Sequence, residues 1–377
     1  MIPDHAKEYI NAVKAFVDNE INPIADEVDR KDNIPDQLID KMAQMGLFGL
    51  LIPREYEGLG FSVLDTCLVS EELAKGGLAF VRLIAGGGLG IVESGTEEQK
   101  RRFLPRLAKG ELIGATTMTE SEAGSDAGNI KTTAVLENGQ YVLNGTKTMI
   151  SRADIAGLFY VSTVTNPEAT SKGRISRILV ERDRKGLTIG SPDPKLGLNG
   201  IHNCQVTCSN CRVPKENLLG KLGEGFSGML DMLNIVRLWV VAAAAVGSAQ
   251  RLLEMSIWHA NERIQFDKTI GSKQAIQWML AEMATEIHAA RVMVHHAAWI
   301  ADQGKKIIRE AAMAKLFASE MAFRVANKAL QIHGGMGYMK AGSVERLFRD
   351  NRVGTIIDGT SEIQKFIIAR DLLKQGS

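Results

Sequence analysis

The chain has few cysteines and no excess of charge, and each shortage excludes a class of protein. Four cysteines in 377 residues are too few for the disulfide framework of a small secreted protein. They predict a reduced, cytoplasmic protein. The formal net charge is +1, so the composition gives no reason to expect nucleic acid or an anionic membrane as the main partner.

Long apolar runs are also absent. No stretch approaches 18 apolar residues without a charge, and the richest run, Val236 to Val246, contains Arg237. This run predicts a buried helix rather than a membrane span. The N-terminal residues carry charges throughout and lack the apolar core of a signal peptide.

The period of the apolar residues changes twice along the chain and predicts three domains. Residues 1–112 have helical spacing, residues 113–220 have the period of two that is typical of strands, and residues 221–377 are helical and rich in alanine. We therefore expect an α+β protein with an N-terminal helical domain, a middle antiparallel β domain and a C-terminal four-helix bundle.

Local signals support this division. Thr96 and Gln99 form a capping-box pattern before a helix expected over Glu97 to Ala108. Two Asn-Gly pairs, Asn138-Gly139 and Asn144-Gly145, predict tight hairpins. The expected strands are Thr132–Leu136, Tyr141–Leu143, Thr146–Ile150, Leu158–Thr163, Ile175–Val180, Leu187–Gly190 and Cys204–Cys208.

A metal centre is not expected. Cys204, Cys208 and Cys211 have the spacing of a radical iron–sulfur motif, but on an extended strand Cys211 would point away from the other two. Among the histidines, His288 and His295 share a helical face without a carboxylate or cysteine to complete a ligand set.

Four stretches offer groups suited to an anionic or planar ligand, through hydroxyls, an arginine fork or exposed backbone N–H groups. Each is weak alone, because glycine turns and Asp-Gly-Thr-Ser segments more often serve as helix caps. The stretches are Met118 to Asp126, Arg263 to Gln274, Gln331 to Tyr338 and Arg349 to Gln364.

Taken together, in this order and spacing, the four stretches resemble the acyl-CoA dehydrogenase family over essentially the whole chain. The resemblance implies a flavoprotein that holds FAD and acts on an acyl thioester of CoA or an acyl carrier protein. It also implies a homotetramer, with an electron-transfer flavoprotein as the candidate electron acceptor. In this family a carboxylate takes the α-proton while the β-hydride goes to the flavin.

The resemblance also assigns residues position by position. FAD would be held by Thr116, Met118, Thr119, Ser125, Met149, Ile150, Ser151, Thr360 and Glu362 of one chain. A neighbouring chain would add Arg263, Gln265, Phe266, Gln274, Gln331, Gly334 and Gly335. The substrate would contact Ser125, Asn234, Arg237, Arg82 and Gly359.

The catalytic position departs from the family pattern. The family's usual Tyr-Glu-Gly-Thr reads Ile357-Asp358-Gly359-Thr360 here, and the alternative position for a base is Val236, which cannot serve. Asp358 is therefore either the base in a reshaped pocket or no base at all. The first case includes a nitroalkane-oxidase-like enzyme, because aspartate serves at this site in the related nitroalkane oxidases. The second case leaves open a desulfinase, an enoyl-CoA reductase or a non-catalytic FAD-binding subunit.

Two further departures concern the substrate and the flavin. Arg82 interrupts the apolar run Leu78 to Ile84 where the acyl tail would end, so it either receives a distal carboxylate or sulfinate, or pairs with Glu71 or Glu72 or reaches the surface. Met149 stands where the family has an aromatic residue beside the flavin. It either fills the same gap or alters electron transfer.

Overall fold

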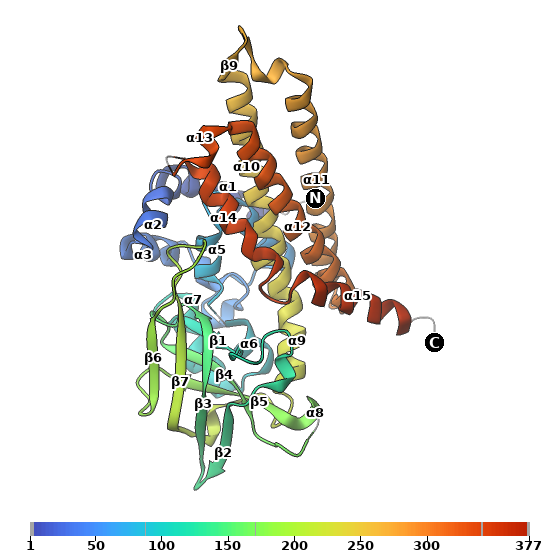
Figure 1. Cartoon of the computed structure of the whole chain (residues 1–377). Coiled ribbons are helices and arrows are strands. Elements are labelled where there is room, and N and C mark those ends of the chain that lie inside the picture. Colours follow the sequence, from blue (N-terminus) through green and yellow to red (C-terminus); the bar gives the residue numbers. More distant parts are fainter. Residues whose placement is uncertain (1–3, 87, 170, 341, 375–377) are drawn as a thin grey trace.

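The computed structural model describes residues 4–86, 88–169, 171–340 and 342–374, which form two helical regions and a sheet (Figure 1). The sheet occupies one end of the molecule and the long helices the other. The N-terminal helices are α1 (Asp4–Phe16), α2 (Ala25–Lys31), α3 (Asp36–Gln44), α4 (Val63–Ala74), α5 (Leu78–Ile84), α6 (Gly88–Ser94) and α7 (Glu97–Ala108). The predicted capping box of Thr96 and Gln99 on α7 is confirmed.

The middle of the chain forms one mixed sheet in the order β6-β7-β3-β2-β4-β5-β8, with β1 beside β4. Most neighbours are antiparallel, whereas β1 and β2 each pair with β4 in parallel. The strands are β1 (Gly114–Thr117), β2 (Thr133–Glu137), β3 (Gln140–Ser151), β4 (Leu158–Val164), β5 (Ile175–Glu181), β6 (Leu187–Pro192), β7 (Asn203–Pro214) and β8 (Leu218–Leu219).

One predicted hairpin is confirmed and the other is wrong. Asn138 and Gly139 both have positive φ, at 49° and 77°, and join β2 to β3. Asn144 and Gly145 instead lie inside β3, where the register against β7 shifts between Leu143 and Gly145. Glycine is needed there because a Cβ on Gly145 would lie 2.5 Å from Thr132 Oγ1. The second Asn-Gly pair therefore marks a bulge rather than a turn.

The C-terminal helices are α9 (Gly225–Val236), the π-helical turn η6 (Arg237–Ala243), α10 (Ala244–Glu262), α11 (Gln274–Asp302), α12 (Ile308–His333), α13 (Gly335–Tyr338), α14 (Ser343–Arg352) and α15 (Ser361–Lys374). A two-stranded ribbon, β9 (Ile264–Gln265) and β10 (Lys268–Thr269), joins α10 to α11. Helix α15 extends away from the bundle (Figure 1). The remaining elements are α8 (Ser171–Arg174) and short single turns.

Helices from both ends of the chain share one core, whereas the sheet has its own. Helix α4 packs against α10, and the predicted stripe of Met321, Val325, Ala329 and Ile332 on α12 is buried. The continuous helix Gly225–Glu262 is long and apolar enough to cross a membrane, but 72% of its apolar window is buried inside the protein. The predicted buried helix over Val236 to Val246 is therefore confirmed.

Candidate active site

The loop between α14 and α15 carries Asp358 in a conformation that needs support. Asp358 has a φ of 52° and Gly359 a φ of 95°, so an aspartate lies in the left-handed region, which non-glycine residues seldom adopt. Arg237 Nε donates to the Asp358 carbonyl at 2.8 Å, and Gln364 Nε2 donates to the Gly359 carbonyl at 2.9 Å. The backbone of this loop is therefore fixed from two helical segments.

A buried lysine supports the same loop. Lys315 Nζ, on α12, donates to the Gly359 carbonyl at 2.8 Å, and its side chain is fully buried. Burial lowers the pKa of Lys315 from 10.5 to about 8. Its partner is a neutral carbonyl, so no carboxylate offsets this charge directly.

The Asp358 carboxylate forms an ion pair with Arg82 of α5. Arg82 Nη1 lies 3.1 Å from Asp358 Oδ2, and each side chain retains only about a sixth of its exposure, at 16% and 17%. Glu71 is instead bound by Arg291 and His295, and Glu72 by Lys75. The predicted pairing of Arg82 with Glu71 or Glu72 is therefore wrong, because Arg82 pairs with Asp358 and both acids have other partners.

A second arginine lies behind Arg82. The guanidinium of Arg152, which follows β3, donates to the carbonyls of Arg82 and Ala85 and is almost fully buried. Burial, followed by the neighbouring charge of Arg82, lowers the pKa of Arg152 from 12.5 to about 9. Arg152 thus fixes the C-terminal part of α5 and adds positive charge near Asp358.

A small cavity begins beside this ion pair. It measures about 20 Å³, which is room for roughly one water-sized group. Its polar lining comes from Arg82, Ser319 and Asn351, and most of the rest is apolar, including Leu78, Val240, Ala322 and Ile357. Arg82 is the only charged side chain among its described lining residues.

The two residues predicted to contact substrate on α9 and η6 are buried and bound to each other. Arg237 Nη1 donates to Asn234 Oδ1 at 2.8 Å, while its Nε supports the Asp358 carbonyl. Burial lowers the pKa of Arg237. In this arrangement Arg237 orients the Asp358 loop. Gly359 lies in that loop, and Thr360 caps α15 by accepting from the N–H of Ile363 at 3.3 Å.

Most of the residues predicted to hold the flavin on one chain come together at the ends of β1 and β3. The N–H of Thr148 donates to the Thr119 carbonyl at 2.9 Å, which ties the loop after β1 to β3. Thr116 and Met149 are exposed on this surface, as is Ser125 on the following loop; Met118, Thr119 and Ser151 are half-buried, and Glu362 is exposed on α15. Ile150 differs, because its side chain lies in the core of the sheet.

A buried ion pair holds the loop that contains Met118 and Thr119. Lys147 Nζ lies 2.8 Å from Glu120 Oε1 and 3.0 Å from the Met118 carbonyl. The Glu120 carboxylate also accepts from Thr132 Oγ1 and from the N–H groups of Lys131 and Thr132. Burial opposes ionisation, but these hydrogen bonds outweigh it and hold the pKa of Glu120 at about 2.

The other predicted flavin residues lie far from Asp358, at the opposite end of the bundle (Figure 1). Arg263, Gln265 and Phe266 lie at or beside the ribbon between α10 and α11, and Gln274 begins α11; all four are exposed. Gln331 is exposed on the last turn of α12, and a side chain added at Gly334 or Gly335 would meet no atom within 4 Å. One chain thus presents two separate groups of predicted cofactor residues.

The cysteine motif forms no metal site among the described residues. Asn210 has a φ of 50° and bulges β7, so Cys211 turns inward beside Cys208 and their thiols hydrogen-bond. The prediction that Cys211 points away from the other two is therefore wrong. All four cysteines are free and buried.

Sequence reasoning missed Lys315 and Arg152. Lys315 occupies the buried stripe of α12 with Ala311, Ala318 and Ala322, so a lone lysine in an alanine-rich face was an available signal. Arg152 follows a strand in a polar segment, and no local pattern distinguishes it from a surface arginine.

Comparison with known proteins identifies the family. Residues 3–111, 115–211 and 223–373 match the acyl-CoA dehydrogenase N-terminal, middle and C-terminal domains. The chain belongs to the acyl-CoA dehydrogenase family. It is 43% identical to the acryloyl-CoA reductase (NADH) of Anaerotignum propionicum over 96% of this chain and 93% of that one. The caffeyl-CoA reductase-Etf complex subunit CarC of Acetobacterium woodii is 40% identical over 96% of both chains.

A solved relative has the same fold. The butyryl-CoA dehydrogenase of Megasphaera elsdenii is 32% identical, with a TM-score of 0.95 over 99% of both chains. This acyl-CoA dehydrogenase is therefore an FAD-dependent oxidoreductase of acyl-CoA thioesters.

The residues present fit FAD. The exposed Met149, the hydroxyl of Thr116 and the loop around Thr119 would face the flavin ring, and Arg263 with the open Gly334-Gly335 backbone suits phosphate groups.

Proposed function

We propose that Asp358 is the catalytic base that removes the α-proton of an acyl-CoA thioester. In the oxidative direction the α C–H electron pair becomes the new double bond as the β-hydrogen leaves with its electrons. The acyl group thereby loses two hydrogens and two electrons. FAD supplies the hydride acceptor.

The observation that carries this proposal is the anchored Asp358 loop. Arg237, Lys315 and Gln364 are buried, and each holds a backbone carbonyl of Asp358 or Gly359. These bonds fix the backbone of the Asp358 loop and do not use the Asp358 carboxylate. Because a misplacement of about 1 Å can cost on the order of 10²-fold in rate, such support compensates for a base that is one methylene shorter than glutamate.

The enoyl-CoA reductase direction is a second candidate for the same site. Two relatives, from Anaerotignum propionicum and Acetobacterium woodii, are named reductases. In that direction the protonated carboxyl of Asp358 returns the proton to the α-carbon, and the β-carbon receives the hydride. The name of the second relative also supports an electron-transfer flavoprotein as the partner of this chain.

We further propose a cytoplasmic homotetramer in which FAD lies between two chains. The predicted flavin residues around Arg263 lie far from those around Thr119, and this separation supports the proposal. A cofactor bound at one of the two sets in one chain would need the other set from a neighbouring chain. Substrate contacts are proposed for Arg82, Ser125, Asn234, Arg237 and Gly359.

Replacement of the base tests the proposal. With Asp358→Asn we expect the loss of flavin bleaching by a substrate thioester, by at least about 10³-fold, with flavin content retained. Asp358→Glu should keep measurable activity because it restores the family's usual base. The control is Asp371→Asn, the same chemical change on the exposed part of α15. Normal bleaching by Asp358→Asn would exclude Asp358 as the base.

A further inference from the structure

The surroundings of Asp358 contain more positive than negative charge. Arg82, Arg152, Arg237 and Lys315 all approach this loop, and three of them donate only to neutral oxygens of carbonyl or amide groups. Glu320 accepts from Ser361 and Glu362 is exposed at the surface, so neither neutralises the arginines. Asp154 is hydrogen-bonded to His202. Among the described residues, the Asp358 carboxylate is the one acid that forms an ion pair with this group of cations.

Arg82 differs from the other three cations. It is the only one that lines the cavity, and its only described hydrogen-bond partner is a carboxylate rather than backbone. A guanidinium has five N–H donors in a planar fork, and the described bond to Asp358 uses one of them. Arg82 therefore can bind a second planar anion that arrives from the cavity side.

The ion pair has a geometric consequence for a base. Asp358 Oδ2 lies 3.1 Å from Arg82 Nη1, so this oxygen must leave the guanidinium before it can contact the α-proton of a substrate. The arrangement in the structure holds the Asp358 carboxylate on Arg82.

We propose that this enzyme selects short acyl-CoA thioesters whose far end carries a carboxylate, and that this carboxylate draws Arg82 away from Asp358 as the substrate binds. The inference rests on the proposed role of Asp358. The substrate anion takes over the charge of Arg82, and the released Asp358 carboxylate accepts the α-proton. An uncharged acyl group leaves the ion pair intact and the base restrained.

The geometry limits the length of the acyl group. Asp358 must lie near the α-carbon, and Arg82 is 3.1 Å from the Asp358 carboxylate. A guanidinium reaches an anion at about 2.7–2.9 Å, so the distal carboxylate lies only a few bonds beyond the α-carbon. Four- and five-carbon acyl groups with a terminal carboxylate meet this limit on length.

The test compares charged and neutral substrates of equal length. Anaerobic flavin bleaching of the holoenzyme is measured with glutaryl-CoA and with its terminal methyl ester, in wild type and in Arg82→Gln. We expect the flavin of the wild type to be bleached about 10- to 100-fold faster by the charged thioester than by the neutral one. In Arg82→Gln that preference disappears, and the neutral ester reacts faster than it does with wild type. Arg102→Gln, an arginine paired with Glu181 on the outer surface of α7, is the control.

Other outcomes overturn the inference. If Arg82→Gln lowers the rate of flavin bleaching equally with both substrates, Arg82 is only a positioning residue for Asp358. An unchanged ratio in Arg82→Gln would mean that Arg82 does not bind the distal group.

A binding measurement separates this inference from the proposed function. The binding of each thioester is monitored by the change that it causes in the flavin spectrum. If the substrate still bleaches the flavin of the Asp358→Asn variant, the assignment of Asp358 as the base fails. The charge preference in binding and its loss in Arg82→Gln would then still show whether Arg82 receives the carboxylate.

Discussion

At the scale of single residues, the site depends on contacts that join distant parts of the chain. The partner of Arg82 could not be read from the sequence, because the ion pair spans 276 positions and Glu71 and Glu72 were nearer. Asp358 itself was predictable because it replaces a recognisable residue in a motif. The role of Arg237 as a support for the Asp358 carbonyl required the structure, since sequence gives no direction for a side chain.

The Lys147–Glu120 ion pair provides a residue-scale prediction. Lys147→Met removes one partner of a buried pair and leaves the Glu120 charge without it, so we expect the free energy of unfolding at pH 7 to fall by about 3–5 kcal/mol. Lys147→Met combined with Glu120→Gln should recover part of that loss. Denaturant unfolding of the two single variants and the double variant measures the coupling. Additive losses would show that the pair does not hold the loop of Met118 and Thr119.

At the scale of elements, the sequence predicted most strands but not their irregularities. The expected runs over Leu158–Thr163 and Ile175–Val180 agree with β4 and β5, because the β-branched and aliphatic residues there suit strands that are buried on both faces. The bulge of β7 at Asn210, which lies opposite Asn144 and Gly145 of β3, was missed. A bulge depends on the register of the neighbouring strand, which period-two spacing within one strand does not contain.

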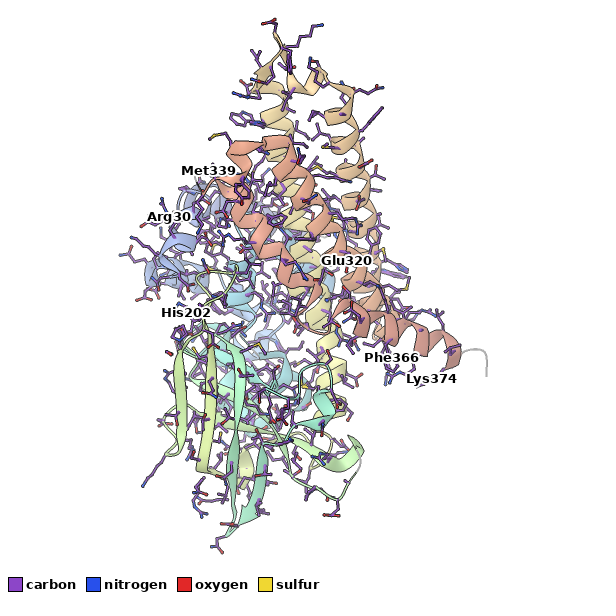
Figure 2. All side chains as sticks on the ribbon, in the orientation of Figure 1. Arg30, His202, Glu320, Met339, Phe366 and Lys374 are labelled. Carbon is purple, nitrogen blue, oxygen red and sulfur yellow. The ribbon has the colours of Figure 1, made fainter. Side chains whose placement is uncertain are left out.

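The loop that precedes β7 provides an element-scale prediction. His202 lies at the end of the sheet facing the N-terminal helices (Figure 2), and its ring hydrogen-bonds to Asp154 and to the carbonyl of Asp32. Burial opposes protonation, but the bonds to Asp154 and Asp32 outweigh it and raise the pKa of His202 above 6.5.

The stabilisation from His202 should therefore be complete below pH 6.5 and disappear as pH rises through the raised pKa of the folded state. We expect His202→Gln to lower the free energy of unfolding by about 1 kcal/mol more at pH 5.5 than at pH 9. Urea unfolding at both pH values measures this difference. An equal cost at the two values would contradict a charged contact.

At the scale of the whole molecule, exposed aromatic residues support the proposed homotetramer. Trp258, Trp278 and Trp299 on α10 and α11 are 67%, 59% and 52% exposed. Phe366 is 59% exposed on α15, which projects from the bundle (Figure 2). Large apolar surfaces on soluble proteins mark contacts with other chains. The homotetramer was predicted only through the family resemblance, because the pattern of residues in one chain does not indicate which face a neighbour covers.

Sedimentation velocity should therefore find one species at four times the 41.1 kDa chain mass. Arg263→Gln should lower the FAD content of the purified protein, because it removes a guanidinium that the proposed tetramer presents to the cofactor of a neighbour. A stable monomer with a full complement of FAD would contradict a shared cofactor.

The central claim is that Asp358 moves the α-proton, and hydrogen exchange at the α-carbon tests it most directly. The holoenzyme is incubated anaerobically in D₂O with an acyl-CoA that the wild type binds, and deuterium at the α-carbon is followed by mass spectrometry. Exchange does not depend on whether oxidation or reduction is the physiological direction. We predict deuterium incorporation by wild type and Asp371→Asn and its loss in Asp358→Asn. Equal incorporation by wild type and Asp358→Asn would contradict the account.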